Sequence, residues 1–355
     1  MIHILDDKQL YKKLDTQDML GHIRNIPQLC RQAWQMASSF RLPQDYAGID
    51  KVVVLGMGGS AIGGDLVAGL IEEDCDIPVF VNRSYDLPAI VDEKTLVIAA
   101  SYSGMTDETL SALEQAIDSG ARKLAITTGG KLMQIAQKHN IPIFSFEYDS
   151  QPRAAFPFVF MSILNFIQQL GFIKDMFADV DELGFVLDKM NNDIGEAVPF
   201  ENNKAKQLAQ QLQNRLAVIY GGGETSAVAC RWKTQFNENS KAWAFYDVFP
   251  ELNHNAVVGY QFPQETCSSV AVIMLCADCM QKEVLRRYQA TSRILDKACI
   301  THFMVEGSGE SKLAQMMSLV LFGDYTSYYL ALLNGVDPTP IEAIDCLKEE
   351  LGKDK

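Results

Sequence analysis

Short apolar runs alternate with helix-like stretches along most of this chain, and the rhythm begins near Lys51. Five runs in the first half are predicted strands: 52–55, 77–81, 96–100, 123–127 and 141–146. The segments between them carry apolar residues at three- and four-residue spacing, such as Leu110, Leu113 and Ile117, which predicts amphipathic helices. Strands that alternate with helices indicate a parallel sheet covered on both faces.

The same rhythm restarts in the second half of the chain. Predicted strands at 216–220, 270–275 and 300–305 alternate with predicted helices at 228–236, 282–297, 313–333 and 341–351. A glycine turn follows the first strand of each half, in VVVLGMGGSA and in LAVIYGGGETSA. We therefore predict an α/β protein with two doubly wound parallel-sheet subdomains that face each other and carry flanking helices. The alternative is a coincidence of two glycine turns.

Residues 1–50 lack this rhythm and are predicted to form a helical lead-in, because Met19, Ile23 and Ile26 recur at helix spacing up to a break at Pro27. The first subdomain is expected to span 51–191 and the second 192–355. A polar stretch from about 192 to 205 is the expected linker. The longest apolar tract, 154–164, is too short to span a bilayer, so we expect no membrane partner.

The first glycine turn has the features of an anion site. Gly56, Gly58 and Gly59 lie between a buried strand and a predicted helix, and Ser60 fits the N-cap of that helix. Unpaired backbone N–H groups and a positive dipole end meet at such a junction and favour phosphate. The turn is neither a P-loop nor a clean dinucleotide motif. Taken alone, it has an alternative as a turn that packs helix on strand.

A second polar loop, Ser101 to Thr106, follows another strand of the same predicted sheet. Ligands of open α/β sheets bind outside the carboxyl ends of the strands, so the two loops can converge. Their hydroxyl groups suit a phosphate monoester. Together the loops predict a phosphate clamp; a Ser/Thr-rich capping loop is the alternative. The residues of the predicted clamp are Gly58, Gly59, Ser60, Ser101, Ser103 and Thr106.

The charge and the cysteine content limit the classes of partner that we expect for this protein. The formal net charge of −14 argues against nucleic-acid binding, although a phosphate site can still be built locally. Eight cysteines are scattered, and only Cys276 and Cys279 have a suggestive spacing. Because a zinc site needs a second pair of ligands beside Cys276 and Cys279, and the sequence offers none, we expect no metal. We interpret the cysteines as reduced, mostly buried thiols of a cytoplasmic protein, and the start MIHILDDKQL does not resemble a signal peptide.

The two loops carry a resemblance to a known family. GMGGSAIGG followed by SYSGMTDET resembles the sugar isomerase (SIS) fold, whose serine-rich loop grips a sugar phosphate. QPRA at 151–154, NENSK at 237–241 and ELNHN at 251–255 resemble the bifunctional phosphoglucose/phosphomannose isomerases within it. The resemblance extends from about residue 15 to the C-terminus. One departure is Met105, which replaces the usual asparagine of the serine loop and cannot donate a hydrogen bond from its side chain.

This resemblance implies reversible isomerisation of glucose 6-phosphate, and of mannose 6-phosphate, to fructose 6-phosphate through a cis-enediol. It implies that Glu238 is the base and that His254 opens the sugar ring from the neighbouring subunit of a homodimer. Arg153 would stabilise the enediolate, and Lys348 would assist ring opening. From the residues alone, each has an ordinary alternative: a solvated glutamate, a structural histidine, a buried ion-pair arginine or a solvated lysine.

The mechanism implied by the resemblance needs neither a metal nor an organic cofactor. Two other functions stay open: a non-catalytic SIS module that senses a sugar phosphate, and an amino-sugar phosphate isomerase. The joint presence of Glu238, His254 and Arg153 favours the isomerase over the sensor, as does the lack of a basic region or a DNA-binding helix pair. A comparison of fructose, mannose and glucosamine 6-phosphates as substrates separates the two enzymes.

Overall fold

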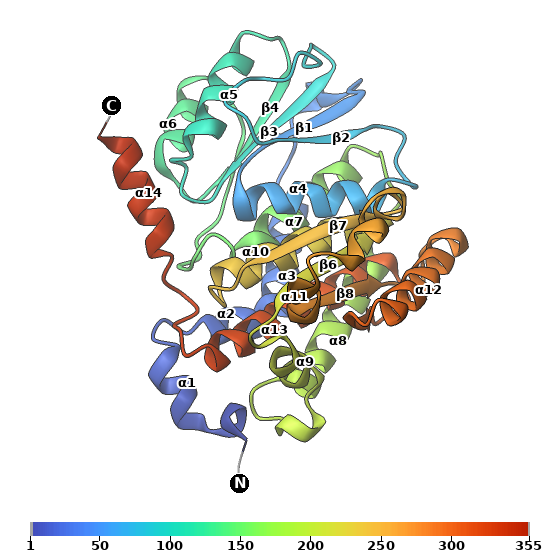
Figure 1. Ribbon diagram of the computed structural model, residues 1–355. Coiled ribbons are helices and arrows are strands. Elements are labelled where there is room, and N and C mark those ends of the chain that lie inside the picture. Colours follow the sequence, from blue (N-terminus) through green and yellow to red (C-terminus); the bar gives the residue numbers. More distant parts are fainter. Residues whose placement is uncertain (1–2, 354–355) are drawn as a thin grey trace.

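The computed structural model describes residues 3–353 and contains two parallel β-sheets joined by helices (Figure 1). The strands of the first sheet are β1 (Lys51–Leu55), β2 (Val79–Asn82), β3 (Thr95–Ser101), β4 (Arg122–Thr127) and β5 (Ile143–Ser145). Their order is β2-β1-β3-β4-β5, and every neighbouring pair is parallel. Helices α4 (Gly58–Ile71), α5 (Asp107–Ile117) and α6 (Gly130–Lys138) belong to this half. The predicted fold class is confirmed.

The second sheet repeats this arrangement with four strands. They are β6 (Leu216–Gly222), β7 (Ala244–Phe249), β8 (Val270–Cys276) and β9 (Thr301–Glu306), in the order β7-β6-β8-β9 and all parallel. Its helices are α10 (Ser226–Glu238), α11 (Gln264–Ser269) and α12 (Lys282–Lys297). The sequence prediction missed β7. This edge strand exposes Phe245 and Tyr246, so it lacks the continuous burial that marks the central strands.

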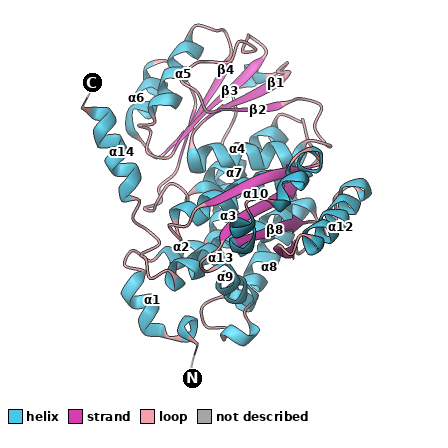
Figure 2. Cartoon of the chain, viewed as in Figure 1, coloured by secondary structure: helices cyan, strands magenta, loops and turns pink. Residues whose placement is uncertain are grey.

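A shared helical layer connects the two sheets. Figure 2 shows helices α4 and α7 between the two groups of strands, and α10 packs against α4 and against strands β6 and β7. The remaining helices are α1 (Lys8–Leu14), α2 (Met19–Arg24), α3 (Ile26–Ser39), α7 (Phe156–Gln169), α8 (Phe177–Ile194), α9 (Lys204–Leu212), α13 (Lys312–Leu333) and α14 (Glu342–Gly352). Helices α7 and α13 are buried on nearly all sides, as expected for helices that are apolar all round. One apolar core therefore reaches from the first sheet to the second.

Two connecting segments differ in detail from the expectation. The helical pattern is interrupted at Asn25, between α2 and α3, and Pro27 lies in the first turn of α3, where proline is tolerated because the N–H is unpaired anyway. In the stretch 192–205, α8 continues to Ile194, α9 begins at Lys204, and Asn203 between them is fully buried. Lys206 just beyond it is also buried, and its Nζ donates to Asp6 Oδ1 at 2.9 Å and to the Val198 carbonyl at 2.8 Å.

The described residues test two further expectations: that the cysteines are reduced and mostly buried, and that no segment spans a membrane. Within residues 3–353 no cysteine forms a disulfide, but only Cys30 and Cys276 are buried, so the expectation of mostly buried thiols is wrong. No helix in this range combines the length and the apolar character that crossing a bilayer requires.

Candidate active site

The two loops of the predicted clamp leave the same edge of the first sheet. Strands β1 and β3 are direct neighbours, with Leu55 opposite Ala99, so the glycine turn and the serine loop begin side by side. The strand order reverses between these two strands, which is where open α/β sheets form a crevice. The structure thus brings together the two loops that the sequence predicts to cooperate.

The glycine turn differs from the prediction in one detail. Helix α4 already begins at Gly58, with Met57 at its N-cap, so Ser60 lies inside the first turn and is buried instead of capping the helix. Gly58 has a φ of +50°, a conformation that favours glycine. A Cβ at Gly59 would lie 2.7 Å from the carbonyl oxygen of Pro152. Gly59 is therefore needed for the close approach of the segment that carries Arg153.

The serine loop is held by its own hydroxyl groups. The hydroxyls of Ser101 and Thr106 form a hydrogen bond of 2.8 Å, and Ser103 Oγ accepts from the Met105 N–H at 3.2 Å. Gly104 has a φ of +63°, and a Cβ there would lie 1.9 Å from the Gly129 carbonyl oxygen. Met105 exposes 49% of its surface. Its departure from the family pattern therefore leaves the hydroxyl contacts of this loop intact.

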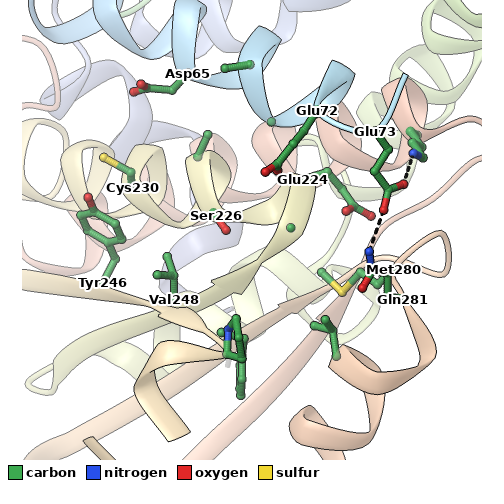
Figure 3. Close-up of a pocket in the computed structure, with 18 of the residues that line it drawn as sticks. Asp65, Glu72, Glu73, Glu224, Ser226, Cys230, Tyr246, Val248, Met280 and Gln281 are labelled. Carbon is green, nitrogen blue, oxygen red and sulfur yellow. Dashed lines mark hydrogen bonds and ion pairs between the residues drawn. The ribbon is translucent and has the colours of Figure 1, made fainter. Parts of the chain in front are cut away.

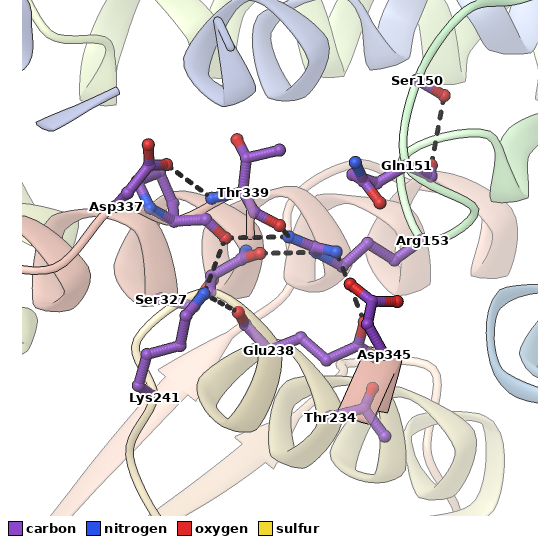
Figure 4. A network of polar contacts seen from close by, with 12 residues as sticks. Ser150, Gln151, Arg153, Thr234, Glu238, Lys241, Ser327, Asp337, Thr339 and Asp345 are labelled. Carbon is purple, nitrogen blue, oxygen red and sulfur yellow. Dashed lines mark hydrogen bonds and ion pairs between the residues drawn. The ribbon is translucent and has the colours of Figure 1, made fainter. Parts of the chain in front are cut away.

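Arg153 and Glu238 meet beside the glycine turn, since a Cβ at Gly59 would lie 3.2 Å from Arg153 Cα; Figure 4 shows their polar contacts. Arg153 precedes α7 and is 3% exposed, whereas Glu238 is the last residue of α10 and keeps 26% of its side chain exposed. Arg153 Nη1 lies 3.4 Å from Glu238 Oε2. The structure thus joins two of the four residues to which the sequence analysis gives a chemical role.

Three further partners hold the Arg153 guanidinium in place. Its Nε donates to Asn239 Oδ1 at 2.8 Å, and its Nη2 donates to the carbonyls of Pro338 and Thr339 at 2.8 and 2.9 Å. Burial lowers the pKa of Arg153, and the negative charge of Glu238 opposes that shift. Since arginine stays charged in proteins, Arg153 provides a positively charged guanidinium whose orientation is fixed by these hydrogen bonds.

A second buried pair supports the Arg153 backbone. Arg231 on α10 and Asp324 on α13 are both nearly inaccessible, and Arg231 Nη2 lies 2.6 Å from Asp324 Oδ2. The same nitrogen donates to the Arg153 carbonyl at 3.4 Å, and the guanidinium stacks 3.7 Å above the Phe156 ring. The charged side chain of Arg231 in an otherwise core-forming helix is a signal that the sequence analysis overlooked.

A cavity of about 780 Å³ opens beside Glu238. Its wall comes from two segments, 237–243 and 336–344, which include Lys241, Trp243 and the start of α14. The hydroxyl of Thr339, next to this wall, is buried and has no hydrogen-bond partner among the described residues. The sequence analysis did not single out three further residues of this site, Asn239, Lys241 and Thr339. The partners of Lys241 are backbone carbonyls, and Asn239 and Thr339 contact Arg153, which is far away in the sequence.

His254 does not reach Glu238 within one chain. It lies exposed in a short 3₁₀ helix, Glu251–His254, which follows the carboxyl end of β7. Glu238 ends the helix that precedes β7, so the strand separates the two residues. Six residues of strand span about 20 Å at ~3.3 Å per residue. Within one protomer, the predicted base and the predicted ring-opening histidine therefore lie at opposite ends of strand β7.

Lys348 is also apart from the Arg153–Glu238 pair. It lies on α14, none of whose residues is buried, and its side chain is 70% exposed. Its Nζ is 3.9 Å from Asp345 Oδ1, one turn earlier in the same helix. Figure 1 shows α14 projecting from the body of the molecule. From this helix, only Glu342, Ala343 and Ile344 in its first turn line the cavity beside Glu238.

The second glycine turn borders a different pocket (Figure 3). This pocket also measures about 780 Å³ and lies between α4 and the carboxyl edge of the second sheet. Its walls carry Asp65, Glu72, Glu73 and Glu224, against Arg83 and Lys312. Because Arg83 is paired with Asp65, and Lys312 with Glu73, the remaining charge is negative. Such a pocket repels phosphate, so the two glycine turns are not equivalent as anion sites.

Across residues 3–353, the side chains of His, Cys, Asp and Glu nowhere gather in a group of three that could hold a metal ion.

Comparisons with known proteins identify close relatives. The model of the bacterial phospho-glucose isomerase C-terminal SIS domain matches residues 201–351. A bifunctional phosphoglucose/phosphomannose isomerase of Caldicellulosiruptor bescii is 41% identical over 95% of this chain and 100% of its own length. One from Aquifex aeolicus is 34% identical over 88% of this chain and 93% of its own length.

The fold has solved counterparts as well. The crystal structure of a hypothetical protein from Thermus thermophilus superimposes with a TM-score of 0.75 and 16% identity, covering 98% of this chain and 92% of that one. At this identity the match supports the fold alone.

Proposed function

The chain belongs to the bifunctional phosphoglucose/phosphomannose isomerase family, and we propose on this basis that it interconverts glucose 6-phosphate and mannose 6-phosphate with fructose 6-phosphate. The observation that carries the proposal is the contact between the buried Arg153 and Glu238, a residue that lines a cavity. Aldose–ketose isomerisation needs a base for the proton that moves between C1 and C2, and positive charge near the enediolate oxygen. These two side chains supply both.

In this proposal Glu238 takes the proton from one carbon and returns it to the other. Its side chain is 26% exposed and the residue lines the cavity, which supports access for a substrate. The buried guanidinium of Arg153 faces the same carboxylate and is held by three other acceptors. Because its orientation is set before a substrate binds, the arginine needs little reorganisation when negative charge develops on the sugar.

The phosphate is held by the clamp of the first sheet. Its members are Gly58, Gly59, Ser60, Ser101, Ser103 and Thr106. The packing of Gly59 against Pro152 and Arg153 supports this role, because it couples the glycine turn to the segment that carries the arginine. The acidic surroundings of the second glycine turn support the choice of the first turn.

We propose that the active form is a homodimer in which the partner contributes His254 to each site. The separation of His254 from Glu238 by the length of β7 supports an origin in the second subunit. Lys348 assists ring opening from α14, whose first turn lines the Glu238 cavity. The free cysteines support a cytoplasmic protein, since disulfides are rare in that compartment. No metal or organic cofactor takes part.

A coupled spectrophotometric assay with glucose 6-phosphate and mannose 6-phosphate tests the proposal. Formation of fructose 6-phosphate from both sugars is the expected result. Turnover of glucosamine 6-phosphate alone would favour an amino-sugar phosphate isomerase. Binding of sugar phosphates without any turnover would favour a non-catalytic sensor.

A further inference from the structure

Lys241 occupies an unusual position next to the proposed base. It follows α10 by three residues and has a φ of +53°, a left-handed conformation that is uncommon for a lysine. Its Nζ donates to the carbonyl of Glu238 at 2.5 Å and to the carbonyl of Pro338 at 3.1 Å. The ammonium group thus joins the end of the helix that carries the base to the loop that precedes α14.

The carbonyl of Pro338 is shared by two cations. Arg153 Nη2 donates to it at 2.8 Å, on the same oxygen that accepts from Lys241. Glu238 is held in the same way from two sides, since its carboxylate contacts Arg153 and its carbonyl contacts Lys241. Figure 4 shows Arg153, Glu238 and Lys241 around one set of polar contacts. A shift of Lys241 would therefore change the positions of both Glu238 and Arg153.

The charge of Lys241 depends on pH near neutrality. Partial burial and the positive charge of Arg153 lower its pKa to about 8, while the carboxylates of Asp337, Glu238 and Glu342 favour the charged form. A protonated ammonium forms stronger hydrogen bonds to carbonyl oxygens than a neutral amine does. Above its pKa, Lys241 would hold the two carbonyls less firmly.

We propose that Lys241 is a positioning residue for the isomerisation: its ammonium group aligns Glu238 and Arg153 by binding the Glu238 and Pro338 carbonyls. This inference rests on the proposed function. Lys241 also lines the cavity beside Glu238, so the two segments that it joins are the two that form the cavity wall. Its effect is on the geometry of the transition state, with little effect on phosphate binding at the first sheet.

The test compares Lys241→Met, which keeps the length but removes the charge, with Lys241→Arg, which keeps a charge at all pH values of the assay. Lys138→Met, in an exposed helix end of the first half, is the matched control. We expect Lys241→Met to lower kcat roughly 10- to 100-fold, as loss of a charge-assisted hydrogen bond does, with a much smaller change in KM. The control should match the wild type.

The pH profile separates alignment from a merely structural role. In the wild type, kcat should fall as pH rises through the Lys241 pKa. This alkaline fall should be absent in Lys241→Met and should move to higher pH in Lys241→Arg. Circular dichroism checks that each variant is folded. If Lys241→Met does not fold, the pH profile of Lys241→Arg tests the proposal instead: an alkaline fall at the same pH as in the wild type would overturn it. A wild-type alkaline fall that persists unchanged in the folded variant overturns the proposal. A wild type that converts neither sugar phosphate overturns this inference together with the proposed function.

Discussion

Arg153 and Glu238 lie 85 residues apart in the sequence, yet Nη1 of the one is 3.4 Å from Oε2 of the other. The arginine comes from the segment before α7 and the glutamate from the end of α10, so the contact crosses from one half of the chain to the other. Asn239 and the carbonyls of Pro338 and Thr339 hold the arginine in this direction. The proposed chemistry depends on this junction, and the proposed phosphate clamp lies on the sheet whose glycine turn packs against it.

The phosphate clamp predicts a selective effect on substrate affinity. Ser103→Ala and Thr106→Ala should each raise KM roughly 10-fold or more, because each removes a hydroxyl donor to a charged oxygen. Steady-state kinetics with glucose 6-phosphate measures the change. Ser226→Ala, after the second glycine turn, is the control and should leave KM unchanged. Inorganic phosphate and arabinose 5-phosphate should compete with the substrate of the wild type; failure of both to compete would rule out the clamp.

The location of His254 predicts complementation between subunits. Glu238→Gln and His254→Asn proteins should each be nearly inactive alone. Refolded together, they can form mixed dimers in which one of the two sites carries both native side chains. Random pairing should restore up to about a quarter of the wild-type activity. If the two variants stay inactive after mixed dimers have been verified by mass spectrometry, His254 does not act in the neighbouring subunit.

The buried Arg231–Asp324 pair predicts a large effect on stability. Asp324→Asn leaves the Arg231 charge buried and uncompensated, so the free energy of unfolding should fall by about 3–5 kcal/mol. Urea denaturation followed by circular dichroism measures this change. Asp188→Asn breaks an exposed pair with Arg31 and should cost less than about 1 kcal/mol. Equal losses in the two variants would contradict the role assigned to the buried pair.

The strands of both sheets were largely predictable because the central ones are buried on both faces and read as continuous apolar runs. Strand β7 was not, since an edge strand with exposed Phe245 and Tyr246 lacks that pattern. The burial of Asn203 between α8 and α9 was not predictable for a related reason. Its polar side chain binds backbone carbonyls, and the sequence around it looks the same as that of an exposed linker.

The same difficulty limits the prediction of the site. Motif resemblance identified Arg153 and Glu238, and the structure brings them together. It could not identify the carbonyls of Pro338 and Thr339 as partners of the arginine, because any residue supplies a carbonyl and only the fold determines which one is near. The capping role given to Ser60 was wrong because the N-cap of α4 is Met57, three residues before the serine.

The most direct test of the central claim is the turnover of Glu238→Gln with glucose 6-phosphate, measured beside the wild type in the same coupled assay. Glutamine keeps the size of the side chain, but it cannot take up the proton. We predict that kcat falls roughly 10²-fold or more, with folding intact by circular dichroism. A folded Glu238→Gln protein that turns over at nearly the wild-type rate would contradict the account.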